Sequence, residues 1–116
     1  MCSVQSFIGG GISNVLFSAS TSSVIGGGQS NSGCTTVSFI GGGQCNAIIV
    51  GNISSIVGGS LNSMCSCFSF IGGGNNNTVG VGYSFIGGGS CNITCGSLYP
   101  VIVGGSGNTV TSSAGS

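Results

Sequence analysis

The sequence of 116 residues predicts an all-β fold, a parallel β-solenoid that forms one repeat domain. Three observations predict it. An isoleucine recurs every 15 to 17 residues, a glycine pair follows each isoleucine after two and three residues, and an asparagine follows it after six. This period is too short for a helix–turn–helix unit and fits one β-coil. Glycine triplets also disfavour helix, because each internal glycine costs about 1 kcal/mol relative to alanine.

Seven copies of the motif divide the single domain, 1–116, into seven coils. They lie near residues 6–22, 23–37, 38–53, 54–68, 69–83, 84–99 and 100–116. The isoleucines are the expected structural core: Ile8, Ile25, Ile40, Ile56, Ile71, Ile86 and Ile102. The asparagines are the expected turn residues, whose amides form a ladder between coils: Asn14, Asn31, Asn46, Asn62, Asn77, Asn92 and Asn108.

Each coil is expected to begin with a strand of the type Ser-Phe-Ile-Gly-Gly-Gly. A turn follows at the asparagine, because Asn tolerates a left-handed backbone and bonds its own main chain. The second strand has its inward residue two places after the asparagine, and a Gly/Ser-rich loop then closes the coil. That inward position holds Leu16, Ile48, Met64, Val79 and Val110, with Gly33 and Thr94 as exceptions.

The first strand predicts a subunit interface. Its side chains alternate between two faces, and the face opposite the isoleucine carries Phe7, Phe39, Phe70 and Phe85. In the fourth coil the large residue moves from one outward position to the next, leaving Ser55 and Val57. Packed surfaces conserve volume in this way. We therefore expect the phenylalanines to lie between subunits.

The composition excludes most catalytic and nucleic-acid functions. The chain has no Lys, Arg, Asp, Glu or His. No base remains to activate a nucleophile, so we expect no enzyme and no cofactor. Phosphate neutralisation needs Lys or Arg, so no nucleic-acid partner is expected. Apolar runs are far shorter than a membrane span needs, and no signal peptide is recognisable at the N-terminus.

The motif Ser-Phe-Ile-Gly-Gly-Gly-x-x-Asn, at residues 38–46 and 84–92, resembles the YadA-like head repeat of trimeric autotransporter adhesins. Related Ile-Gly-Gly-Gly-x-x-Asn repeats occur in bacterial and giant-virus surface proteins. The resemblance covers residues 6–112. It implies a left-handed parallel roll, a homotrimer and an adhesive or fibrous role outside the cell or on a particle surface. Ile40, Gly42, Gly43 and Asn46 match the roll-forming positions. The chain lacks the family's stalk, membrane anchor and surface charges.

Seven cysteines predict no regular disulfide framework. Cys34, Cys65 and Cys95 occupy the same position in alternate coils, too far apart to pair with one another inside one chain. Pairing across positions or between chains stays open. A zinc site at Cys65, Cys67 and Cys95 lacks histidine and the usual spacing. The favoured interpretation is that the cysteines are small buried fillers.

Two loop asparagines, Asn52 and Asn76, lie in sequons and are possible glycosylation sites. Asn92 also lies in a sequon, but its place in the ladder makes it a poor acceptor. Tyr83 and Tyr99 flank closing loops, where carbohydrate stacking is one interpretation and ordinary packing the favoured one.

The sequence thus predicts a non-catalytic structural subunit of a homo-oligomeric surface fibre. Its partner is itself, as a trimer and, through end-to-end stacking of coils, as a polymer. The alternative is an adhesin or fibre head that recognises a glycan or a cell-surface receptor.

Overall fold

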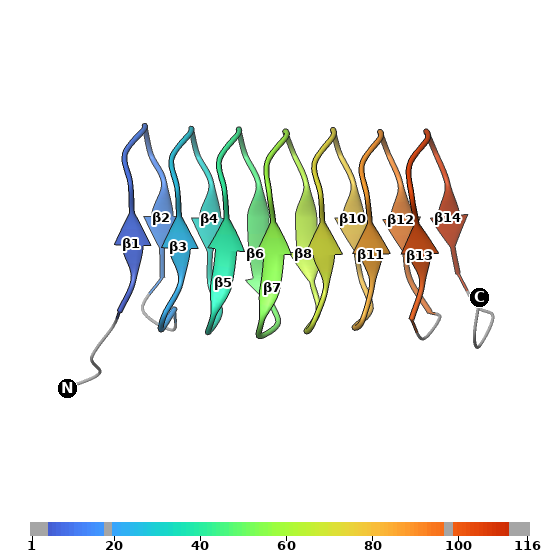
Figure 1. The fold of residues 1–116 in the computed structure, drawn as a ribbon, viewed down its shortest axis with the longest axis horizontal. Coiled ribbons are helices and arrows are strands. Elements are labelled where there is room, and N and C mark those ends of the chain that lie inside the picture. The colour runs from blue at the N-terminus through green and yellow to red at the C-terminus, as the bar shows by residue number, and fades with distance from the viewer. Residues whose placement is uncertain (1–4, 18–19, 97–98, 112–116) are drawn as a thin grey trace.

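The computed structural model describes residues 5–17, 20–96 and 99–111, and these residues form a β-solenoid. Two parallel sheets of seven strands each lie back to back (Figure 1). The path from β1 to β13 makes six full turns. The described residues contain no helix. Hence nothing in this part of the chain is a helix that could cross a membrane. The all-β parallel solenoid expected from the repeat is confirmed.

The first strands of the coils form the first sheet. It consists of β1 (Phe7–Ile8), β3 (Val24–Ile25), β5 (Ser38–Ile40), β7 (Ser54–Ile56), β9 (Phe70–Ile71), β11 (Phe85–Ile86) and β13 (Val101–Ile102). The second sheet consists of β2 (Val15–Leu16), β4 (Ser32–Gly33), β6 (Ala47–Val50), β8 (Ser63–Cys65), β10 (Thr78–Val79), β12 (Ile93–Thr94) and β14 (Thr109–Val110).

Equivalent residues of successive coils pair directly. Ile25 pairs with Ile40, and Ile71 pairs with Ile86, so the isoleucines form one column along the axis. Their side chains are buried from the second coil onward, together with Ile48, Met64 and Val79 from the second sheet. One column from each sheet therefore fills the core between the sheets.

Ile8 departs from the expected core. It is 41% exposed, whereas the next four isoleucines of the column are at most 1% exposed. Its strand, β1, is the first strand of the first sheet, so a described neighbour covers it on one side only. Leu16 and Val110 in the outermost coils are likewise only partly buried.

Coil length varies only in the closing corner. Each asparagine follows its isoleucine by six residues, whereas the next isoleucine follows after 9 to 11. The third coil accommodates one such extra residue through a register shift between Ile48 and Val50 in β6. The glycine-rich half of the coil thus keeps a fixed geometry.

The left-handed residue of the turn precedes the asparagine, contrary to expectation. Ser30, Cys45, Leu61, Asn76 and Cys91 have φ between 55° and 59°, while no ladder asparagine has a positive φ. The asparagine side chain is therefore free to turn inward, where it bonds neighbouring coils.

Candidate functional site

The interior of the glycine-rich corner is a ladder of asparagines. The five inner members, Asn31, Asn46, Asn62, Asn77 and Asn92, are 0% exposed. Asn62 shows the pattern: its Nδ2 donates to the carbonyl oxygens of Gly58 and Gly74, and its Oδ1 accepts from the backbone N–H of Asn77. Every hydrogen-bonding group of the amide is used within the solenoid. The ladder stabilises the coils, and its five inner members present no amide to a ligand.

Close approach of neighbouring coils explains two of the three glycines in each triplet. In the fifth coil, a Cβ on Gly74 would lie 2.0 Å from the carbonyl oxygen of Gly89, and Gly74 has φ of +88°. A Cβ on Gly72 would lie 2.3 Å from the carbonyl oxygen of Gly87. The middle glycine, Gly73, faces open space. The triplets thus pack backbone against backbone.

Serines line the inside of the opposite, closing corner. Ser23, Ser38, Ser54, Ser69 and Ser84 are buried, each two residues before an isoleucine. The hydroxyl of Ser23 donates to the carbonyl oxygen of Thr35 at 2.8 Å, and the hydroxyl of Ser54 to that of Ser66 at 2.9 Å. Among the described residues, no buried side-chain nitrogen or oxygen lacks a partner. The interior is therefore satisfied without a single charge.

The outward side of the first sheet is apolar. We call it the Phe face: Phe7, Val24, Phe39, Ser55, Phe70, Phe85 and Val101. Phe7, Phe39 and Phe85 are 60%, 42% and 39% exposed in the single chain, and Phe70 is half-buried. The rings of Phe70 and Phe85 stack with centroids 5.3 Å apart. The interface residues expected from the sequence thus lie on one solvent-facing surface.

The exchange of Phe/Gly for Ser/Val in the fourth coil has a cause within the strand. The Cε1 atom of Phe39 lies 3.3 Å from the position that a Cβ on Gly41 would occupy, and Phe70 covers Gly72 in the same way at 3.4 Å. Each ring therefore lies over the glycine two residues later. Volume conservation at Ser55 and Val57 does not by itself require a second chain. The argument for a second chain rests instead on the exposed apolar area of the Phe face.

A second apolar column lies beside the Phe face, at the closing corner. From the second coil onward, the residue three before each isoleucine has φ between 53° and 59°, and these residues include Val37, Ile53, Phe68, Tyr83 and Tyr99. They are 47–60% exposed. A left-handed backbone is unfavourable for β-branched and bulky residues. Exposure to solvent does not favour apolar side chains either, so the local environment does not explain these residue types. We call this column the corner column.

Rings of the corner column stack along the solenoid axis. Phe68 and Tyr83 are nearly parallel, at 10°, with centroids 5.2 Å apart, while Tyr83 and Tyr99 are tilted by 49° at 5.3 Å. Sequence reasoning noticed the two tyrosines but missed the column. Its signal was present in the sequence, as a bulky residue three places before five of the seven isoleucines.

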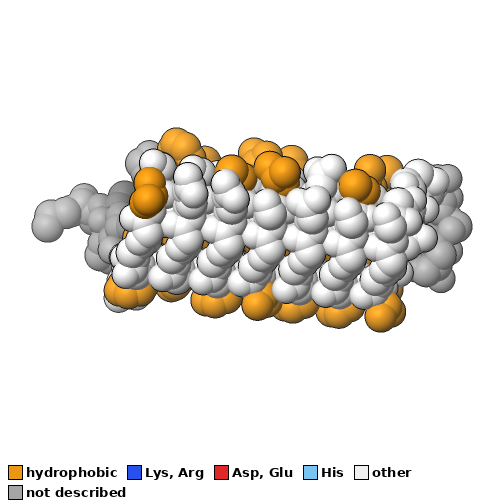
Figure 2. Space-filling model, turned by 90° about the horizontal axis from the view of Figure 1, so that it is seen from above, with side chains coloured by type: hydrophobic (Ala, Val, Ile, Leu, Met, Phe, Trp, Pro, Cys, Tyr) orange, Lys and Arg blue, Asp and Glu red, His pale blue; other side chains and the backbone are white. Residues whose placement is uncertain are grey.

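Apolar side chains flank the glycine-rich corner on both sides. Figure 2, which looks down on this corner, shows a mostly white strip of polar side chains and backbone with apolar side chains along its two margins. Those margins are the outer faces of the two sheets. The solenoid therefore presents two apolar flanks, separated by a polar ridge.

The cysteines are not buried fillers, so that expectation is wrong. Cys34, Cys65 and Cys91 are exposed, and Cys45, Cys67 and Cys95 are half-buried; all six are free thiols. Cys2 lies outside the described residues. Within the described part of the chain, no three potential metal ligands of the Cys, His, Asp or Glu type come together.

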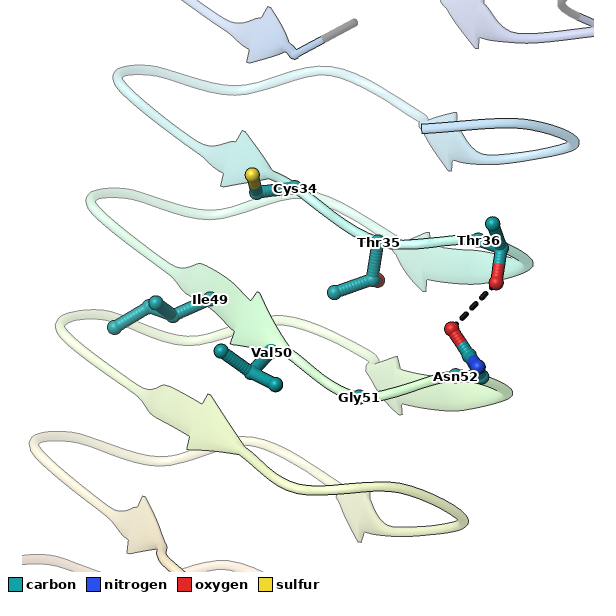
Figure 3. A pocket seen from close by; sticks show the side chains of 7 residues that line it. All are labelled: Cys34, Thr35, Thr36, Ile49, Val50, Gly51 and Asn52. Carbon is teal, nitrogen blue, oxygen red and sulfur yellow. Dashed lines mark hydrogen bonds between the residues drawn. The ribbon is translucent and has the colours of Figure 1, made fainter. Parts of the chain in front are cut away.

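An open hollow of about 240 Å³ lies between the second and third coils, near the closing corner. Figure 3 shows Cys34, Thr35 and Thr36 from one coil and residues 49–52 from the next. The hydroxyl of Thr36 bonds the Oδ1 of Asn52 across the hollow. Both sequon asparagines in loops, Asn52 and Asn76, are exposed. Asn76 has φ of 57° and occupies the left-handed turn position.

The features described above are extended surfaces and a shallow hollow. The described side chains form two apolar flanks and a shallow hollow, with no base, acid or cation beside any nucleophile. No family model, no curated protein and no solved structure matches the chain.

Proposed function

We propose that the chain is a non-catalytic structural subunit of a homo-oligomeric fibre, most simply a trimer packed through the Phe face. The exposed phenylalanines of that face carry the proposal. Monomeric soluble proteins rarely expose contiguous apolar surface of this kind, and such patches mark interaction sites. Burying one phenylalanine fully is worth about 1.5–3 kcal/mol, and the Phe face repeats this gain along the solenoid.

The absence of charge supports self-association. Net charge ordinarily keeps proteins soluble and monomeric through mutual repulsion, and this chain has none. Copies of the Phe face can therefore approach one another without desolvating a charged side chain. The same composition fits a surface that is covered by neighbouring subunits.

End-to-end stacking would extend the subunit into a filament. Among the described strands, β1 and β2 lie at one end of the solenoid and β13 and β14 at the other (Figure 1). Edge strands template further pairing when their backbone groups have no partner. Seven coils at ~4.8 Å give a body only roughly 34 Å long, so a long fibre needs many copies.

The handedness of the solenoid and the location of the protein are part of the same proposal. A left-handed coil is supported by the course of the ribbon in Figure 1, which rises along the near strands, descends along the far ones and advances to the right. The resemblance to surface repeats supports a place outside the cell or on a particle.

A binding head for a glycan or receptor is the alternative, and the corner column bears on it. Sugars stack on free faces of aromatic rings, but Phe68 and Tyr83 direct their faces at each other. The corner column therefore favours packing against a protein surface over sugar stacking.

Light scattering and electron microscopy under reducing conditions test the fibre. We expect a trimer mass that gives way to filaments at higher concentration, and no binding to a glycan array. The double variant Phe39→Ser/Phe85→Ser should shift the mass to the monomer, whereas Phe17→Ser, at a more exposed phenylalanine that follows β2 on the other side of the solenoid, should not. Discrete monomers of the parent at all concentrations would refute the proposal, and saturable glycan binding by them would favour the head.

A further inference from the structure

The outward side of the second sheet carries a regular column of thiols. We call this side the Cys face; its two columns lie seven and nine residues after each isoleucine. The first column is Val15, Ser32, Ala47, Ser63, Thr78, Ile93 and Thr109, and the second is Phe17, Cys34, Ile49, Cys65, Gly80, Cys95 and Thr111. All fourteen are exposed or half-buried, and the three cysteines are free.

These three thiols cannot pair with one another inside the chain. Cys34 and Cys65 lie two coils apart, as do Cys65 and Cys95, which separates each pair by roughly 9.6 Å along the sheet. A disulfide needs Cα atoms within about 7 Å. Between Cys34 and Cys65, the register shift in β6 leaves Ile49 and Val50, of which Val50 pairs with Cys65, and between Cys65 and Cys95 lies Gly80; none of these has sulfur.

We propose that the column is a covalent cross-linking site for a second copy of the same chain. The spacing is symmetric about Cys65. A two-fold axis through Cys65, along the strand direction, brings Cys65 against Cys65 of the second copy. The same axis brings Cys34 against Cys95 of the second copy, and Cys95 against its Cys34. One isologous contact thus aligns three disulfides.

The side chains between the cysteines favour this antiparallel arrangement of the two solenoids. It places the two exposed residues of the third coil, Ile49 and Val50, opposite Gly80, and Ser32 opposite Ile93, so large residues face small ones. A parallel arrangement would place Ile49 against Ile49 and Gly80 against Gly80. It would create a clash and a gap in the same column.

The Cys face is large enough for such a contact and allows a second copy to approach closely. The chain measures 43 by 26 Å on its broad side, and seven strands at ~4.8 Å make the Cys face roughly 34 Å long, the scale of a standard interface of ~800 Å² per partner. Sheets packed through large side chains lie about 10 Å apart. On one side of Cys65 the residues Ser63, Thr78 and Gly80 are small, and the larger Val50 on its other side faces Gly80 of the second copy, which allows the closer approach that a disulfide needs.

A low-molecular-weight disulfide such as oxidised glutathione supplies the oxidising equivalents. The thiolate of one cysteine attacks it, forms a mixed disulfide and releases one glutathione thiol. The facing thiolate of the second copy then displaces the second glutathione. For each bridge, two protein thiols lose two protons and two electrons, and the reagent disulfide is reduced to two thiols.

This inference goes beyond the proposed fibre because it uses the opposite sheet. If protomers pack through the Phe face, their Cys faces point outward. The cross-links would then join neighbouring fibres laterally.

The test uses a column-only variant of the full chain, in which Cys2, Cys45, Cys67 and Cys91 are serine. An equal mixture of ¹⁴N- and ¹⁵N-labelled protein is oxidised with glutathione disulfide. Because the chain has no Lys or Arg for trypsin, it is digested with pepsin for mass spectrometry. We expect a species at twice the 11.0 kDa chain mass, and two isotopically mixed bridges, Cys65–Cys65 and Cys34–Cys95.

Two further variants control the result. In the column-only background, Cys65→Ser should keep the covalent dimer through its two Cys34–Cys95 bridges. In the parent background, the triple serine variant of Cys34, Cys65 and Cys95 should lose that dimer while its circular dichroism is unchanged. Bridges between two copies of Cys34, Cys34–Cys95 bridges of a single isotope, a failure to dimerise, or an equally abundant dimer from the triple variant would each overturn the proposal.

Discussion

The backbone N–H of Asn77 donates a 3.0 Å hydrogen bond to the Oδ1 of Asn62, one coil earlier. The same relation joins Asn46 to Asn62 and Asn77 to Asn92. Each buried amide thus fixes its own turn through one glycine carbonyl oxygen and bonds the next coil twice, through a second glycine carbonyl oxygen and an asparagine N–H. These contacts make the ladder the part of the chain where a conservative substitution should have the largest effect.

Replacing Asn62 with alanine should destabilise the chain by at least about 2 kcal/mol. It leaves the N–H of Asn77 and the carbonyl oxygen of Gly58 without their partner, and each unsatisfied buried group costs about 1–3 kcal/mol. The carbonyl oxygen of Gly74 loses one hydrogen bond but still accepts from the backbone N–H of Ser60. Chemical unfolding followed by circular dichroism measures the loss. The change Asn77→Ala should behave alike, whereas Asn76→Ala, at the exposed neighbouring position, should cost far less. Equal losses at Asn76 and Asn77 would contradict a structural ladder.

Replacing Asn62 with aspartate should make the stability of the folded chain depend on pH. Burial beside the carbonyl oxygens of Gly58 and Gly74 disfavours the charged carboxylate, so we expect its pKa to be raised in the folded chain. The folded state then binds the proton more tightly than the unfolded one. Stability should be highest below the unfolded pKa of about 3.9 and should fall as pH rises through the folded pKa. The parent, which has no Asp, Glu or His, is the control. A variant whose stability rises from pH 3 to 7 would contradict this environment.

Two adjacent glycines should respond oppositely to alanine. Gly58→Ala should be tolerated, because a Cβ there meets nothing within 4 Å. Gly59→Ala should lower the unfolding midpoint severely, since its Cβ would meet the carbonyl oxygen of Gly74 and its backbone has φ of +87°. Thermal unfolding of the two variants side by side is the measurement. Similar midpoints for both would mean that neighbouring coils do not approach as closely as described.

A cysteine introduced at Gly80 should bridge to Cys95. A Cβ on Gly80 lies 3.8 Å from the Cβ of Cys95, close to the mean of about 3.8 Å found in disulfides. Mild oxidation of Gly80→Cys at low protein concentration should therefore form an intrachain bridge, seen in peptic peptides. Gly58→Cys, which faces open space, is the matched control and should form no bridge to Cys95. If the thiol of the Gly80→Cys variant stays unpaired while the chain stays folded, the strands are in another register.

Adjacent residues on opposite faces of β9 should separate assembly from folding. Phe70→Lys places a charge on the Phe face and should abolish oligomers while β-structure remains. Ile71→Lys buries a charge in the core, where Ile71 is 0% exposed, and should abolish both. Oligomer mass and far-UV circular dichroism of each variant give the two readouts. Normal assembly of the Phe70 variant would remove that face from the interface.

The period of the motif was sufficient to predict the solenoid. Isoleucine and asparagine recur in step because each coil must bond the next, so their spacing reports the stacking directly. The outward direction of the cysteine column was also predictable, because Cys34 follows the inward position of Gly33. Assigning cysteines to the interior relied on residue type instead, and the alternation of the strand was the better guide.

Other features could not be predicted from the repeat. The corner column opposes backbone preference, since Val37 and Ile53 adopt a left-handed conformation that their side chains disfavour. A left-handed backbone would lead one to expect glycine or asparagine at these positions. The left-handed residue before each asparagine was missed for a similar reason: residues as different as Leu61 and Cys91 occupy it. The exposure of Ile8 depends on its place at the end of the stack, which a repeat motif does not encode.

The ladder also has a direction. In every rung the amide oxygen of one coil accepts from the N–H of the following coil, from Asn14 and Asn31 at one end to Asn92 and Asn108 at the other. Copies joined end to end with the ladder continued would all point the same way. Such a filament is polar: one tip offers a hydrogen-bond acceptor at Asn108 and the other a donor at Asn14. Its two tips should therefore grow at unequal rates.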